Sequence, residues 1–228
     1  MTTGNPMEQE KIVAVSTVEA VLVIAVTFIL ILLLGGLFYL VLDTGLALIL
    51  TELIILAVPL VYLLSKGVNV KRYVGLDISP KLVLLGFASG AILLFVDVIV
   101  SLVLVIFLGE SQAVIESNKV ITDLISSPSG LVAVATALTL AGICEEFAFR
   151  GFLQNTLTRR FSFAPAVLIS ALIFGLFHFD IQLVYILSAL SAGLVLGYVY
   201  HRWNSYTVAA IAHSSVNLLV LVTLILGI

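Results

Sequence analysis

The chain has 228 residues, of which 62% are hydrophobic and 10% are charged, and its formal net charge is −3. Soluble domains are roughly 45–50% apolar and about 25% charged, so this composition excludes a water-soluble globular fold. No basic cluster of the kind that binds nucleic acid is present, so we expect no nucleic acid among its partners. The mean hydropathy of +1.29 instead predicts a protein surrounded by membrane lipids.

Apolar segments long enough to cross a bilayer follow one another along most of the chain. A spanning helix needs about 20 residues. We expect spans at 18–42, 44–65, 81–109, 129–149, 162–179, 181–200 and 206–227. The long third segment would give one span more if it breaks near Gly86 and Gly90. The predicted fold class is therefore all-α, a polytopic transmembrane helix bundle of about seven to eight spans.

The length suits one domain, so we expect a polar N-terminal tail at 1–16 and a single transmembrane helical domain at 17–228. The first apolar segment exceeds the ~7–15 residues of a signal-peptide core, so it is expected to remain as an anchor. Three longer connections are expected, a polar loop, an acidic loop and a short interfacial helix, at 66–80, 110–129 and 151–164.

The basic residues flank alternate connections. They are Lys66, Lys71, Arg72, Lys81, Arg159, Arg160 and Arg202, whereas the first and fifth connections carry only Asp43 and Asp180. Short loops rich in Lys and Arg stay in the cytoplasm. We therefore predict a multi-pass protein of the cell membrane with a cytoplasmic N-terminus, and Lys119 is the contrary residue.

The densest polar cluster within a span is Glu145, Glu146 and Arg150. A charged side chain in hydrocarbon costs about 2.5–3.5 kcal/mol on insertion scales, so each needs a partner. Glu146 and Arg150 are i and i+4 in the order that favours an ion pair. Glu145 is turned by about 100° from Glu146, which leaves it for chemistry as a general base. The alternative is that both glutamates only join this helix to its neighbours.

Two further motifs lie on later spans. Phe174 and His178 share one helix face, and so do His213 and Asn217. His and Asn side chains donate hydrogen bonds, so the second pair could stabilise an oxyanion. Taken singly, His178 could be an interfacial residue, and His213 with Asn217 could be a hydrogen-bonded contact between helices.

Together these motifs resemble the type II CAAX prenyl protease and bacteriocin-processing family, also called the Abi family, whose members are glutamate intramembrane proteases. That family carries Glu-Glu-x-x-x-Arg, Phe-x-x-x-His and His-x-x-x-Asn or -Asp on separate helices in this order. A glycine-containing run at 191–197 is also similar to the family. The resemblance covers about 130–220, which would be the catalytic core.

The resemblance implies an intramembrane endopeptidase in which Glu145 and His178 activate a water molecule. His213 and Asn217 would stabilise the oxyanion, with Glu146, Arg150 and Phe174 in support. The implied substrate is a prenylated, CAAX-type or other membrane-tethered peptide, cut near its C-terminus in a chamber open to the cytoplasm. With the spans above, however, Glu145 lies near the cytoplasmic end of its helix and His178 near the outer end of the next.

Other chemistries stay open. No cofactor is expected, but a divalent metal such as zinc could be bound by Glu145, His178 and His213. Cys144 beside Glu145 could pair with a histidine, although a lone cysteine is more often a packing residue. Glu52 and Asp97 lie within spans and are compatible with a proton-coupled transporter. A non-catalytic membrane scaffold or bacteriocin-immunity protein would keep the fold without needing Glu145.

Overall fold

The computed structural model describes residues 15–227, and over this range it is built from helices without any strand. The N-terminal half contains α1 (Thr17–Leu30), the π-helix η1 (Ile31–Gly35), α2 (Gly36–Val41), α3 (Thr44–Ser65), α4 (Val70–Val74), α5 (Pro80–Leu108) and α6 (Gln112–Ile125). The C-terminal half contains α7 (Pro128–Glu146), the π-helix η2 (Phe147–Gln154), α8 (Asn155–Leu157), α9 (Phe163–Phe177), α10 (Val184–Trp203) and α11 (Tyr206–Leu226). The predicted all-α class is confirmed.

Within the described range, 6 helical segments are long and apolar enough to cross a membrane. They are Thr17–Val41, Thr44–Ser65, Pro80–Leu108, Pro128–Leu157, Val184–Trp203 and Tyr206–Leu226. Helix α9, expected as a full span, is apolar but only 15 residues long, or about 22 Å. Of the predicted polar tail, residues 1–14 lie outside the described residues. Ser16 caps α1 by accepting a hydrogen bond from the backbone amide of Glu19.

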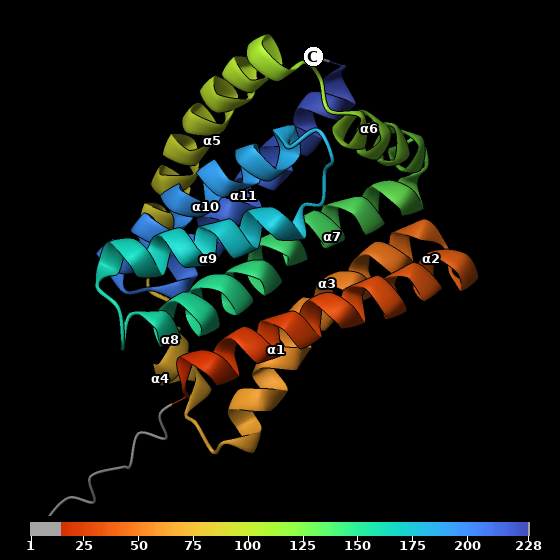
Figure 1. Ribbon diagram of the computed structural model, residues 1–228. Coiled ribbons are helices and arrows are strands. Elements are labelled where there is room, and N and C mark those ends of the chain that lie inside the picture. The colour runs from red at the N-terminus through yellow and green to blue at the C-terminus, as the bar shows by residue number, and fades with distance from the viewer. Residues whose placement is uncertain (1–14, 228) are drawn as a thin grey trace, which may run out of the picture.

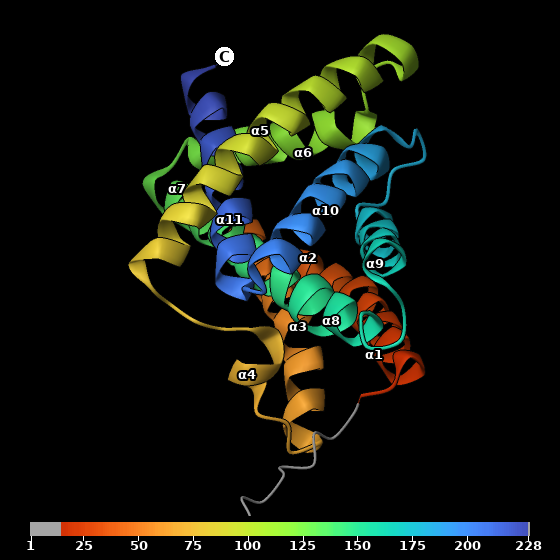
Figure 2. The same cartoon turned by 90° about the vertical axis from the view of Figure 1, so that its left-hand side faces the viewer.

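Helix α7 lies at the centre of the bundle, with α3 packed on one side and α11 on the other. Helix α11 also packs against α5, and α10 packs against both α5 and α9 (Figures 1 and 2). The three motif-bearing helices are therefore neighbours, since α7 continues directly into η2, and η2 contacts α9, α10 and α11.

The fourth span is longer than the sequence suggested. The predicted end at residue 149 and the interfacial helix at 151–164 are wrong, because the helix runs without interruption from Pro128 to Leu157. Gly151 does not end it: a Cβ there would lie 2.9 Å from the Cβ of Val74, so glycine allows α4 to pack closely against η2. The continuation is buried, and Glu145 consequently lies well inside the span rather than one turn from its end.

Two connections also differ from expectation. The acidic loop predicted at 110–129 contains α6, whose apolar and small polar residues 114, 117, 118 and 121 recur at helical spacing. Ser111 caps its first turn. The third span has no break, because Gly86 and Gly90 lie within a continuous α5 and face Ile211 and Ser215 of α11 at close range.

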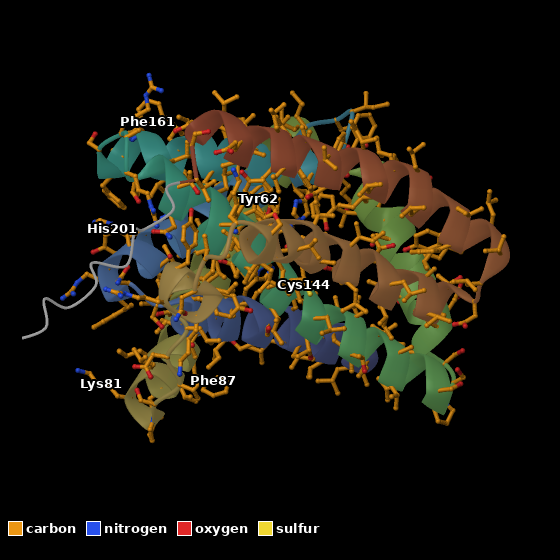
Figure 3. All side chains as sticks on the ribbon, turned by 90° about the horizontal axis from the view of Figure 1, so that it is seen from below. Tyr62, Lys81, Phe87, Cys144, Phe161 and His201 are labelled. Atoms are coloured by element: carbon orange, nitrogen blue, oxygen red, sulfur yellow. The ribbon has the colours of Figure 1, made fainter. Side chains whose placement is uncertain are left out.

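The two ends of the bundle differ in charge. Basic residues gather in α4, at the start of α5, and near the ends of α3, α8 and α10: Lys66, Lys71, Arg72, Lys81, Arg159, Arg160 and Arg202. Figure 3 shows Lys81 and His201 at this end, whereas Cys144 lies midway along the bundle. We call this the basic end. The opposite end carries α6 and the acidic residues Asp43, Glu110, Glu116, Asp123 and Asp180, with Lys119 (Figure 1). We call this the α6 end.

Asp180 fixes the connection between α9 and α10 at the α6 end. Its carboxylate accepts hydrogen bonds from the backbone amides of Gln182 at 3.0 Å and Tyr185 at 2.8 Å. Burial raises the pKa of Asp180, but these hydrogen bonds outweigh it and hold the pKa below its usual range. A carboxylate with a lowered pKa stabilises the fold above its unfolded pKa, near 4, and this contribution disappears as the pH falls through the folded pKa.

We expect Asp180→Ala to lower the melting temperature in detergent at pH 7, corresponding to a loss on the order of 1 kcal/mol. The difference from wild type should begin to shrink below about pH 4 and disappear as the pH falls through the lower pKa of the folded carboxylate. Asp123→Ala, on the exposed side of α6, is the control and should change little. A difference that stays constant from neutral to acidic pH would contradict this assignment.

Candidate active site

The predicted ion pair between Glu146 and Arg150 is present and fully buried. Arg150 Nη1 donates to Glu146 Oε1 at 2.8 Å, and both side chains are 0% exposed. The second guanidinium nitrogen, Nη2, donates to the carbonyl of Gly193 on α10 at 3.2 Å. His213 Nδ1 on α11 lies 2.9 Å from the same Glu146 oxygen. Glu146 is therefore the residue through which three helical segments are joined.

Phe174 connects this ion pair to the two histidines. Its ring lies 4.4 Å from the Arg150 guanidinium carbon, in cation–π geometry. The centroid distances from Phe174 to His178 and His213 are 4.8 and 6.0 Å. This explains why an aromatic residue stands four positions before His178: its ring fills the space between the guanidinium and both imidazoles.

His178 has a defined tautomer. Its Nδ1 lies 3.0 Å from the carbonyl oxygen of Phe174. A carbonyl only accepts, so Nδ1 carries the proton and Nε2 is left as an acceptor. The residue ends α9, and its ring also meets Tyr185 edge-on with a centroid distance of 4.9 Å. His178 Nε2 is thereby left free of this contact and can accept a hydrogen bond.

Glu145 is adjacent to His213 rather than to the ion pair. Its Oε2 lies 3.8 Å from His213 Nε2, and the two side chains are 13% and 12% exposed. That separation is too long for a direct hydrogen bond and short enough for an electrostatic interaction between the two groups. Glu146 and Glu145 thus face different ring nitrogens of one histidine, and the sequence alone did not indicate this arrangement.

Asn217 lies one turn further along α11, where its Nδ2 donates to the carbonyl of Leu138 on α7 at 3.2 Å. An amide nitrogen carries two hydrogens, so one remains for a second acceptor. The structure therefore shows Asn217 in a contact between helices. One amide hydrogen is left over, which is what a role in stabilising an oxyanion would need.

A cavity of about 550 Å³ adjoins these residues. Phe174, His178, His213 and Asn217 are on its wall, whereas Glu145 is not and lies 3.8 Å behind His213. Sequence reasoning did not include Tyr185 and Ser188, which also line the cavity. Ser188 donates to Asp97 at 3.0 Å, so Asp97 belongs to the same wall. The sequence does contain a signal for these two residues, because Ser188 follows Tyr185 by about one helical turn and therefore lies on the same face of α10.

Two residues of the alternative readings, Glu52 and Cys144, do not line this cavity, whereas Asp97 does. Glu52 lines a second, smaller cavity of about 240 Å³ between α3, α6 and α7. Cys144 is fully buried in the packed core and lines neither cavity. Within residues 15–227, no group of three or more His, Cys, Asp or Glu side chains is placed to hold a metal ion.

Close approach of α7 and α11 depends on Gly142. A Cβ at this position would collide with the backbone nitrogen and Oγ of Ser214, next to His213. The missing side chain thus lets the helix that bears Glu145 and Glu146 approach the helix that bears His213.

Gly142→Ala is expected to separate these helices and destabilise the fold by about 1–3 kcal/mol. The matched control is Gly36→Ala in α2, where a Cβ would meet nothing within 4 Å. Thermal melting in detergent would measure both variants. Equal melting temperatures for the two would show that the close approach is not needed.

Fold and site together define a multi-pass helical membrane protein with a Glu-Arg-His cluster beside an internal cavity. Residues 127–219 match the family model described as type II CAAX prenyl endopeptidase Rce1-like. This segment contains all three motifs and nearly coincides with the core expected at 130–220, so the predicted family resemblance is confirmed there. The matched family is a family of proteases. No curated protein and no solved structure matches the chain.

Proposed function

We propose that this protein is an intramembrane endopeptidase that hydrolyses a peptide bond near the C-terminus of a membrane-tethered substrate, of which prenylated CAAX-type peptides are one class. The observation that carries the proposal is the arrangement of His178, His213 and Asn217 on one cavity wall with Glu145 beside His213. The family match over 127–219 supports the same class of reaction.

In the proposed reaction, a water molecule sits between the Glu145 carboxylate and the histidines and attacks the peptide carbonyl. Glu145 takes a proton from this water, and the unprotonated Nε2 of His178 accepts a hydrogen bond from it. The proton is then passed to the leaving amine, which departs when the tetrahedral intermediate collapses. Attack, proton transfer and departure together consume one water and release two peptides.

The developing oxyanion would be stabilised by His213 Nε2 and by the second hydrogen of Asn217 Nδ2. Glu146 accepts from His213 Nδ1, so in this proposal the ring donates to the oxyanion from Nε2 when both ring nitrogens carry a proton. Arg150 in turn holds Glu146 in place, so its role is to position His213 rather than to touch substrate.

The test is incubation of the purified, reconstituted protein with a farnesylated CAAX reporter peptide, with the products identified by mass. We expect loss of the C-terminal residues. A folded protein that cuts neither this reporter nor other lipid-anchored peptides would favour the scaffold or immunity alternative. The proton-coupled transporter would instead require Glu52, which lines the smaller cavity, and Asp97, which lines the same cavity as His178 and His213.

The proposed reaction needs no metal, and we expect chelators to leave the cleavage rate unchanged. The support is the donor set, because no three ligating side chains are grouped within residues 15–227. The alternative is zinc bound by Glu145, His178 and His213. It predicts loss of activity with 1,10-phenanthroline and recovery when zinc is returned.

A further inference from the structure

The proposed site lies between a packed layer and an open cavity, and the two face opposite ends of the bundle. Five residues on the cavity wall are exposed, and all lie toward the α6 end: Val105, Glu110, Ile115, Ser117 and Val220. They come from the end of α5, from α6 and its preceding turn, and from the last third of α11. The cavity therefore reaches the surface at the α6 end.

Toward the basic end the site is closed by buried side chains of η2 and α8. Phe149, Phe152, Leu153 and Leu157 are at most 1% exposed. Polar groups in this layer are paired across helices: Gln154 Nε2 donates to the carbonyl of Gly197 at 2.9 Å. We call this layer the floor of the site.

Helix α4 covers the floor from the basic end. Asn155 Nδ2 donates to the carbonyl of Tyr73 at 2.6 Å, and the Tyr73 hydroxyl is 2.7 Å from Thr156 Oγ1. Tyr200 donates to the carbonyl of Val74. A peptide arriving from the basic end would have to break these contacts and displace the buried aromatic rings before reaching His178.

The charge distribution assigns the two ends to sides of the membrane. Leaving aside the buried Arg150, the described part of the chain has seven Lys and Arg residues at the basic end and one, Lys119, at the α6 end. Loops rich in Lys and Arg remain cytoplasmic. The start of α1 is also at the basic end (Figure 1). The sequence-based prediction placed both the N-terminus and the site opening in the cytoplasm, whereas the cavity reaches the surface at the end of the bundle opposite the start of α1.

We infer that the cavity takes its substrate from the non-cytoplasmic side, so the cleaved bond belongs to a lipid-anchored peptide exposed on that face of the membrane. The inference rests on the proposed function for the cleavage and on the structure for the side. A prenylated C-terminus on the cytoplasmic face would meet the floor instead. The expected substrates are therefore membrane-tethered peptides whose C-terminal segment has been transported to the non-cytoplasmic face.

The side can be tested without any cleavage assay, by modification of single cysteines in sealed vesicles of both orientations. Ser117→Cys marks the cavity rim, Ala192→Cys the cavity wall, and Lys71→Cys the basic end. The probe is a small, charged, membrane-impermeant thiol reagent. Wild type sets the background, because Cys144, its only cysteine, is fully buried.

We expect Ser117→Cys and Ala192→Cys to react in right-side-out vesicles and Lys71→Cys to react in inverted ones. If Ala192→Cys fails to fold, Val220→Cys replaces it on the exposed part of the wall. Reaction of the cavity cysteine in inverted vesicles, or of Lys71→Cys in right-side-out vesicles, would overturn the inference.

A second arm adds a lipid-anchored reporter with an impermeant peptide to the same vesicles. Cleavage is expected only in the right-side-out orientation, and cleavage only in the inverted one would overturn the inference while leaving the proposed function intact. If no reporter is cut in either orientation, the proposed function fails, and the cysteine modification still decides the side from which the cavity is reached.

Discussion

Glu145→Gln is expected to reduce the rate of peptide cleavage by a factor of about 10²–10⁴ while leaving the protein folded. The substitution keeps the size of the side chain and its place beside His213, and it removes the carboxylate that takes the proton from water. The buried Glu146–Arg150 pair is untouched, so the melting temperature should remain close to that of wild type. Initial rates on the farnesylated reporter and a melting curve measure the two quantities.

The matched control is Glu52→Gln, which neutralises another glutamate within a span. Glu52 lies on α3 and lines the smaller cavity, whose wall includes neither His178 nor His213. Its electrostatic interaction with Glu145 should change the rate by less than the Glu145 substitution does. Equal losses in the two variants would show that the effect reflects charge in the bundle and not a base at position 145.

Arg150→Met is expected to destabilise the protein by about 3–5 kcal/mol, because it leaves the Glu146 carboxylate buried without its partner. The substitution also removes the hydrogen bond to Gly193 and the contact with the Phe174 ring. These contacts link η2 to α10 and α9, so the packing around His178 and His213 is weakened. Thermal melting in detergent should detect this as a large fall, or as failure to recover folded protein.

The double variant Glu146→Gln/Arg150→Met separates charge from packing. Neutralising Glu146 removes the uncompensated charge, so the double variant should be more stable than Arg150→Met alone. Arg160→Met, at the exposed basic end, controls for loss of an arginine in general and should have little effect. A double variant no more stable than the single one would contradict the pairing as the source of the effect.

Local geometry explains which parts of the site could be predicted from the sequence. The ion pair of Glu146 with Arg150 follows from helical spacing alone, since i and i+4 side chains meet on any helix. The membrane bundle follows from composition and from the length of the apolar segments. The order of the three motifs was enough to indicate a family, and the match over 127–219 confirms it.

Contacts between distant segments could not be predicted in this way. His213 bonds to Glu146 across 67 residues of sequence, and only the packing of α7 against α11 reveals it. The π-helix η2 continues through Gly151, which a propensity argument treats as a break. The position of the floor depends on α4 docking beneath η2, so the side on which the cavity opens was also beyond the sequence.

In the proposed reaction, water activated beside Glu145 attacks the peptide bond directly. The most direct test is a single-turnover reaction of the reconstituted wild type with the reporter in ¹⁸O-labelled water, with peptides and protein both analysed by mass. Direct attack by water predicts a shortened peptide with one ¹⁸O in its new carboxylate and no acylated protein at any time. Intact reporter, or a peptide–protein adduct that forms before the product, would contradict it.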